Sequence, residues 1–213
     1  MSVVRNILLA IILFTSYMNG HSKEILSKND TIMDNKLDFE LLDKYAEKTQ
    51  KKDAKGIYFQ YYWMFTETDY LSGNTRNGFV VWQTPPKPAF FKIYKEYHPN
   101  GYLRLKGKRM GGGATMIEEW EYYDEKGQLT SKKNEDDKFG KFSYNELLLF
   151  LQHEGHLNLV TGENREKVDF GYNVEIKQWN VYAIDANFWV TEYVIDGETG
   201  EVISKKEYQG GQM

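Results

Sequence analysis

The sequence predicts an α+β, β-rich fold, in which an antiparallel meander of hairpins has two helices packed against it. Aromatic residues make up 15% of the 213 residues, and aromatic side chains are enriched in strands. One hairpin-like pattern occurs twice, with an offset of 26 residues between Gly101 and Gly127. Two other segments carry apolar residues at helical spacing. Because one hairpin is not stable alone, the repeat predicts a stacked meander.

The repeated pattern is a pair of strands joined by a turn that ends in glycine. In the first copy, Pro99 fixes φ, Asn100 suits the next turn position and Gly101 can take a positive φ without steric cost. In the second copy, residues 124–127 make the same turn without proline. Strand alternation then predicts one apolar face and one face toward water. The apolar set is Tyr94, Leu103, Trp120 and Leu129, and the water-facing set is Lys95, Arg104 and Glu121.

Residues 96–107 and 122–129 resemble the bacterial MORN-type repeats, whose consensus reads Tyr-Tyr-Pro-Asn-Gly-Lys-Leu-Lys, then any two residues and a glycine. This chain has two clear copies, separated by an atypical triple glycine at 111–113. Some proteins of this type are grouped with antitoxins and immunity proteins. The resemblance therefore implies stacked hairpins and a protein partner.

The N-terminus is typical of a secretory signal peptide. Arg5 supplies the positive region, Ile7–Phe14 is a short apolar run, and small residues lie near Ser22, where we expect cleavage. The apolar run is shorter than a transmembrane helix needs, although an uncleaved anchor is the alternative. The chain contains no cysteine, which favours a bacterial periplasm or cell exterior over a eukaryotic secreted domain.

Composition excludes several classes of function. The net charge of −4 shows no basic footprint for nucleic acid. The absence of cysteine excludes disulfides, thiolate catalysis and zinc ribbons. We expect no cofactor and no stable membrane span after signal cleavage.

The first helix is predicted from Asp34 to Lys52, capped by Asp34 and ended near Gly56. It either packs on the sheet or docks a partner.

The strand after this helix, Ile57–Thr66, has aromatic residues on both faces, so it is either covered on both sides or exposes one face for binding. We expect a loop at Thr68–Gly78 and a short strand at Phe79–Gln83, which the prolines after it end.

The second helix is predicted from Ser143 to Glu154, where Ser143 and Glu146 form a capping box. Three strands should follow, at Tyr172–Trp179, Phe188–Asp196 and Glu201–Tyr208. The last hairpin, residues 193–203, resembles the end of the PepSY-like modules of exported bacterial proteins. That resemblance implies binding or inhibition of a peptidase.

We divide the chain into a signal peptide at 1–22, a leader and helix at 23–55, a MORN-like β region at 56–136, and a helix with a three-stranded PepSY-like region at 141–209. The charged stretch at 134–140 is the best candidate boundary.

Catalytic motifs are weak. His153 and His156 could bind a divalent ion if they shared one helix face, but the zincin spacing is absent, and a histidine at a helix C-terminus is the simpler interpretation. The sequence contains neither a Gly-x-Ser-x-Gly elbow nor a P-loop.

We therefore expect an exported, non-enzymatic protein-binding module, specifically an immunity or antitoxin-like protein of the MORN-repeat type. The alternatives are a PepSY-like inhibitor or chaperone of an exported peptidase, and a divergent secreted hydrolase. The predicted partner-binding residues are aromatics and arginines, which dominate interface hot spots. They are Tyr97, Tyr102, Arg104, Arg109, Trp120 and Tyr122. These aromatics could equally be core residues.

Overall fold

The computed structural model describes residues 35–67, 69–110, 112 and 115–210. The predicted signal peptide at 1–22 and the helix cap at Asp34 lie outside these ranges. Within the described residues the chain forms two compact units. The N-terminal unit contains residues 35–83, 95–105 and 123–129, and the C-terminal unit contains 84–94, 106–122 and 130–210.

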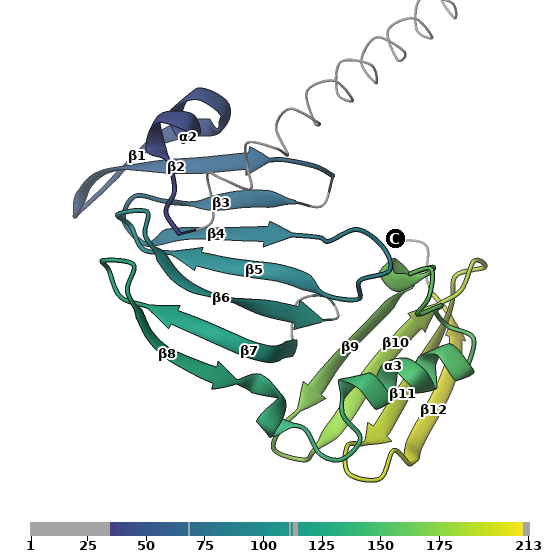
Figure 1. The fold of residues 1–213 in the computed structure, drawn as a ribbon. Coiled ribbons are helices and arrows are strands. Elements are labelled where there is room, and N and C mark those ends of the chain that lie inside the picture. The colour runs from purple at the N-terminus through teal and green to yellow at the C-terminus, as the bar shows by residue number, and fades with distance from the viewer. Residues whose placement is uncertain (1–34, 68, 111, 113–114, 211–213) are drawn as a thin grey trace, which may run out of the picture. The chain divides into compact units, whose positions relative to one another are not determined.

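Twelve strands form two antiparallel sheets within the described residues, which confirms the β-rich α+β class (Figure 1). In the first sheet the strands follow chain order from β1 to β8, and in the second the order is β12-β11-β10-β9. Every neighbour in each sheet is therefore consecutive in sequence, as in a meander. The strands of the first sheet are β1 Glu47–Asp53, β2 Gly56–Met64, β3 Tyr70–Asn74, β4 Gly78–Gln83, β5 Lys92–Tyr97, β6 Leu103–Met110, β7 Thr115–Tyr123 and β8 Leu129–Asn134. Those of the second are β9 Val168–Asn173, β10 Gln178–Ile184, β11 Trp189–Asp196 and β12 Val202–Gln209.

The first helix is shorter than the sequence predicts. Helix α2 spans Phe39–Tyr45, and its N-cap is Asp38, whose side chain accepts hydrogen bonds from the backbone of Glu40 and Leu41. The second half of the predicted helix, Glu47–Asp53, is strand β1, which pairs with β2. The prediction is wrong there because residues 47–53 carry no apolar side chain for a helix to bury, while β2 offers a complete set of backbone partners.

Helix α2 and one face of the sheet enclose the core of the N-terminal unit. Leu37 and Leu42 are buried beside a row of residues from β2, β3 and β4. The buried strand residues of this core include Tyr61, Trp63, Leu71, Phe79 and Val81. The predicted loop at Thr68–Gly78 is wrong in part, because Tyr70–Asn74 pairs with β2 and β4 as strand β3.

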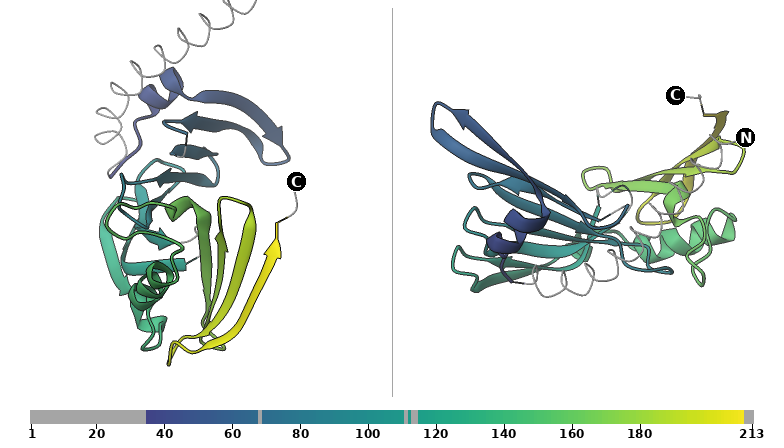
Figure 2. Two further views of the ribbon diagram at one scale, coloured as in Figure 1. Left: turned by 90° about the vertical axis from the view of Figure 1, so that its right-hand side faces the viewer. Right: turned by 90° about the horizontal axis from the view of Figure 1, so that it is seen from above.

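In the C-terminal unit, helix α3 spans Tyr144–His153 and covers one face of the second sheet (Figures 1 and 2). The predicted capping box between Ser143 and Glu146 is confirmed. Leu147, Leu148 and Leu151 of α3 join a buried cluster with the sheet. Its strand members include Phe170, Trp179, Val181, Tyr193 and Ile195. The stretch 134–140 lies inside this unit and contains a short 3-10 helix, Glu135–Lys138.

The second sheet has four strands, not the expected three. Residues 174–177 connect β9 to β10, so the predicted strand Tyr172–Trp179 is wrong. The Asn173 side chain accepts hydrogen bonds from the backbone of Glu175 and Ile176. Such a side-chain bond offers the backbone a turn in place of the strand ladder.

Both repeat turns have the predicted geometry. The amide of Gly101 donates to the carbonyl of His98 at 2.9 Å, and that of Gly127 to Asp124 at 2.9 Å. The φ angles of the two glycines are 86° and 75°.

The expectation that Leu129 faces the core is wrong, because β8 is an edge strand of exposed residues. Leu129 itself is 50% exposed.

Candidate binding surfaces

Two of the predicted partner-binding residues are core residues. Tyr97 is 1% exposed in the N-terminal unit, and Trp120 is 0% exposed in the C-terminal unit. Burial leaves these side chains no surface for a partner, so neither is a contact residue in this fold. Large aromatics supply the most apolar area per residue, which explains why each repeat places one inside.

Arg109 stabilises the packing of Trp120. Its guanidinium carbon lies 4.2 Å from the centroid of the Tyr94 ring and 5.4 Å from that of Trp120. The two aromatic rings lie 5.8 Å apart. Gly107 makes room for this arrangement, because the Trp120 ring occupies the space where a Cβ would stand. Arg109 is thus half-buried in a cation–π stack and is a structural residue.

The other three predicted residues keep exposed surface. The Arg104 side chain is 55% exposed and its guanidinium lies 3.5 Å from the Glu96 carboxylate. Tyr102 and Tyr122 are half-buried, and the Lys36 ammonium lies 4.4 Å above the Tyr102 ring. The six residues divide between the units, since Tyr97, Tyr102 and Arg104 belong to the N-terminal unit and the other three to the C-terminal unit. The repeat hairpins therefore do not gather them on one surface of either unit.

In the C-terminal unit a ladder of ion pairs crosses β6, β7 and β8. The Lys106 ammonium lies 2.8 Å from Glu121, and Lys132 lies 3.0 Å from Glu121 and 2.7 Å from Glu119. These two carboxylates raise the pKa of Lys132 to about 12. Alternation from Trp120 puts Glu119 and Glu121 on the opposite face of β7. Because the charges already neutralise one another, this ladder offers a partner little unpaired charge.

A stronger candidate surface is the uncovered face of β2, β3 and β4. Cross-strand pairing aligns Met64 with Tyr70, and Tyr70 with Trp82. Met64 is 53% and Tyr62 39% exposed, and the rings of Tyr62 and Tyr70 lie 6.3 Å apart. We name this surface the β2–β4 open face. Its residues are Tyr58, Tyr62, Met64, Tyr70 and Trp82, with the Arg76 guanidinium 4.5 Å from the Tyr58 ring.

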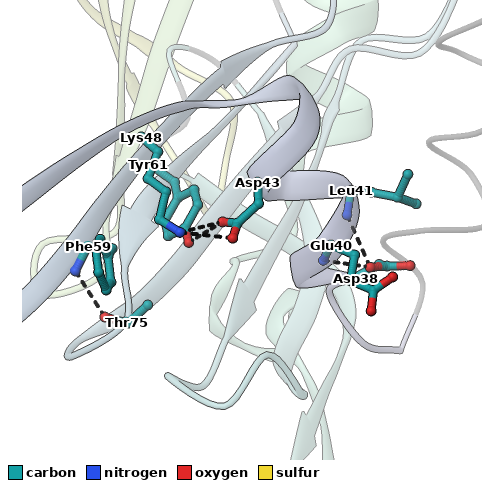
Figure 3. Close-up of polar contacts among 8 residues, drawn as sticks. All are labelled: Asp38, Glu40, Leu41, Asp43, Lys48, Phe59, Tyr61 and Thr75. Atoms are coloured by element: carbon teal, nitrogen blue, oxygen red, sulfur yellow. Dashed lines mark hydrogen bonds and ion pairs between the residues drawn. The ribbon is translucent and has the colours of Figure 1, made fainter.

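The opposite face of the same strands is fixed by α2. The Tyr61 hydroxyl donates to the Asp43 carboxylate at 2.6 Å, and the Lys48 ammonium lies 2.8 Å from the same carboxylate (Figure 3). The hydrogen bond from Lys48 and that from Tyr61 lower the pKa of Asp43, while burial raises the pKa of Tyr61. This cluster ties helix α2 to β1 and β2. Helix α2 therefore covers the face of β2 that carries Tyr61 and Trp63, and the open face keeps Tyr62 and Met64 exposed.

The open face was detectable in the sequence but was not among the predicted contacts. Aromatic residues at both odd and even positions of 57–66 indicated either that the strand is covered on both sides or that one of its faces is exposed. The structure shows one exposed face. The choice of face depends on where α2 packs, which alternation alone does not show.

His153 and His156, the weak metal-ligand candidates, do not share one helix face, because His156 lies beyond the end of α3. Helix α3 ends at His153, whose side chain is 87% exposed, and Gly155 adopts a φ of 80° beyond it. The ring Nε2 of His156 instead lies 2.8 Å from the Tyr193 hydroxyl, which donates to Glu154 at 3.2 Å. Across the described residues no three His, Cys, Asp or Glu side chains are grouped to hold a metal ion.

No helix within the described residues is long and apolar enough to span a membrane. Comparison with family models, curated proteins and solved structures finds no match to this chain.

Proposed function

We propose that this protein is an exported, non-enzymatic protein-binding module that acts as an immunity or antitoxin-like protein, and that the β2–β4 open face is its principal contact surface. The observation that carries the proposal is the set of aromatic and methionine side chains on that face, of which Tyr62 and Met64 are exposed and Tyr58, Tyr70 and Trp82 half-buried. The signal-like N-terminal sequence supports export, and the resemblance of 96–107 and 122–129 to MORN-type repeats supports the immunity role.

The composition of the open face supports binding to protein. Tyr, Trp, Met and Arg are the residues enriched in the centres of protein interfaces, and all four types occur here. Aromatic side chains have few rotatable bonds, so they lose little entropy on binding. The face opposite is anchored by Asp43, Lys48 and Tyr61, which holds β2 in place before a partner arrives.

The distribution of titratable groups supports a binding role over catalysis. In the N-terminal unit Asp43, Lys48 and Tyr61 connect a helix to two strands. In the C-terminal unit His156, Tyr193 and Glu154 connect the end of α3 to β11. Each cluster has a structural role that accounts for its hydrogen bonds.

A second candidate is a PepSY-like inhibitor or chaperone of an exported peptidase. This candidate is favoured by the architecture of the C-terminal unit. There, a capped helix lies on an antiparallel sheet, and the sheet ends in the hairpin of residues 193–203.

The test is site-specific photo-crosslinking in the source organism. A benzoyl-phenylalanine would replace Met64 in the tagged chain, and a matched chain would carry it at Ile57. Both residues lie on β2 and are exposed, at 53% and 58%, but alternation puts them on opposite faces. We expect one stoichiometric adduct from position 64 and little from 57. A toxin-like adduct supports immunity and a peptidase supports the second candidate, whereas equal or absent adducts at the two positions contradict the proposed surface.

A further inference from the structure

The C-terminal unit contains a pocket beside β9 and β10, which are neighbouring strands of the second sheet (Figure 1). Its volume is about 590 Å³, within the range of about 300–1,000 Å³ that small-molecule sites have. Residues that line it include Thr115 of β7, Gly171 and Asn173 of β9, Glu175 of the following turn and Asn180 of β10. All of them belong to the C-terminal unit, so the pocket is a feature of that unit alone.

Gly171 leaves one part of this pocket unfilled. It pairs with Asn180, and no described heavy atom outside its own and adjacent residues lies within 4 Å of the position that a Cβ would take. Phe170 and Trp179 are core residues, so alternation puts Gly171 and Asn180 on the opposite face of their strands. A glycine inside a strand often marks a place where a ligand approaches the backbone closely. The open space beside Gly171 provides such a place.

Two asparagine side chains supply hydrogen-bonding groups to the pocket. A side-chain amide has two donor hydrogens and one acceptor oxygen. The oxygen of Asn173 holds the turn by accepting from the amides of Glu175 at 3.0 Å and Ile176 at 3.4 Å, so its NH₂ group is left to donate. Among the described residues, none makes a hydrogen bond to the half-buried side chain of Asn180. Its donors and its acceptor are therefore available to a ligand.

The charges around the pocket favour a neutral ligand. Glu175 lines it and no lysine or arginine of the described residues does, which disfavours an anion. A cation would use only acceptors and would leave the amide donors of Asn173 and Asn180 without a partner. The nearby Asp169 carboxylate is already engaged, because it accepts from the amides of Gly112 and Phe170. Hydroxyl groups both donate and accept, so they match the whole set.

Apolar surface lies next to these polar groups. Tyr182 follows Asn180 by two residues in β10, which puts both on one face of the sheet, and it is 41% exposed. Val174 also lines the pocket and is 53% exposed. A sugar ring presents hydroxyl groups at its edge and C–H groups on its face, so it needs polar groups beside an aromatic or aliphatic surface. The pocket and its border provide both.

We propose that this pocket binds a neutral carbohydrate. The sugar hydroxyls would form hydrogen bonds with the amides of Asn173 and Asn180 and with the Glu175 carboxylate, and the C–H face of the ring would pack against Tyr182. This binding goes beyond the proposed contact with a protein partner and uses none of the residues of the β2–β4 open face. Either proposal can therefore fail without the other.

The test is a titration of the ¹⁵N-labelled protein followed by amide chemical shifts. The neutral probes are glucose, galactose, N-acetylglucosamine, maltose and cellobiose, and the charged probes are galacturonate and spermidine. We expect at least one neutral sugar to shift the signals of residues 171–180 with a dissociation constant of about 1 mM or lower. Galacturonate and spermidine should bind there at least about 10-fold more weakly than that sugar. The proposal is overturned if no neutral sugar shifts these signals, or if either charged probe binds as tightly.

Three variants locate the site with the neutral sugar that binds. Gly171→Val fills the open space beside β9, and Asn180→Ala removes the free amide. Ser204→Ala is the control, because Ser204 lies in the same cross-strand row two strands away, paired to Val194, which pairs with Asn180. We expect affinity to fall at least about 10-fold for the first two variants and to stay within about 2-fold for the control.

The amide spectrum of each variant shows whether it is folded, and Asn180→Ala decides the matter alone if Gly171→Val is not. Unchanged affinity in Asn180→Ala, or an equal loss in Ser204→Ala, overturns the proposal.

Discussion

Replacing Gly107 by alanine tests the packing of the repeat hairpins. The φ of Gly107 is not in the left-handed region, so the backbone itself would accept a side chain. The obstacle is Trp120, since an added Cβ would lie well inside the 3.0 Å that real Cβ atoms essentially never cross, against Cδ2 and Cε2 of the indole. Trp120 is fully buried and its ring lies 5.8 Å from that of Tyr94, so the indole can shift only by displacing its neighbours.

The expected loss of stability follows from these contacts. Overpacking a core costs about 1–3 kcal/mol. Displacing the indole also weakens the hydrogen bond from Nε1 of Trp120 to the carbonyl of Ile117, now 3.2 Å long, for about 1 kcal/mol more. We expect Gly107→Ala to lower the free energy of unfolding by about 2–4 kcal/mol. The melting temperature should then fall by about 5–15 °C.

The assay is urea unfolding followed by tryptophan fluorescence, with scanning calorimetry as a second readout. Gly171→Ala in β9 is the control, because no atom lies within 4 Å of the position that its new methyl group would take and its φ is also not left-handed. That variant should be neutral or up to about 1 kcal/mol more stable. In a Trp120→Leu background the cost of Gly107→Ala should drop below about 1 kcal/mol. The reasoning is refuted if Gly107→Ala is as mild as Gly171→Ala, or if its cost is unchanged in the Trp120→Leu background.

Three further predictions concern single contacts. Tyr61→Phe removes the hydrogen bond to Asp43 and should cost about 1–2 kcal/mol in urea unfolding, and equal stability of the variant would show that this bond does not anchor α2. Ser143→Ala removes the capping box of α3 and should cost about 1 kcal/mol by the same assay, with no change in the slope of the transition. Burial lowers the pKa of His156 in the folded chain below its usual 6.5, despite the neighbouring Glu154, so the unfolded chain binds the proton at a higher pH than the folded chain does. The contribution of His156 to the free energy of unfolding should therefore be full above pH 6.5 and be lost as the pH falls through the folded pKa. In a pH series of melting temperatures, His156→Gln should make this decline smaller.

The local signals in the sequence were sufficient for the turns and one helix. The Pro99-Asn100-Gly101 turn and the Ser143 capping box depend on residues within a few positions of one another, and both are confirmed. The first helix was predicted too long because Leu37, Leu41 and Tyr45 have helical spacing, and nothing in that spacing marks where it ends. The absence of apolar residues at 47–53 was the available signal.

The candidate surface depended on contacts between distant segments. Trp120 and Tyr97 look like their exposed neighbours in sequence, and only the pairing of strands and the position of α2 decide which aromatics are buried. The second sheet has four strands where three were predicted, and this difference also depends on strand pairing. Residues 168–173 form a strand because they pair with β10. Alternation gives the two faces of a strand but does not say which one the fold covers.

The central claim is that the β2–β4 open face binds a protein partner. Calorimetric titration of the purified crosslinked partner against wild type, Met64→Ser and Ile57→Ser tests it most directly. Truncating an interface anchor costs about 1–2 kcal/mol, so we predict an affinity about 5- to 30-fold weaker for Met64→Ser and unchanged for Ile57→Ser. Equal affinities for the three proteins, or a loss confined to Ile57→Ser, would contradict the claim.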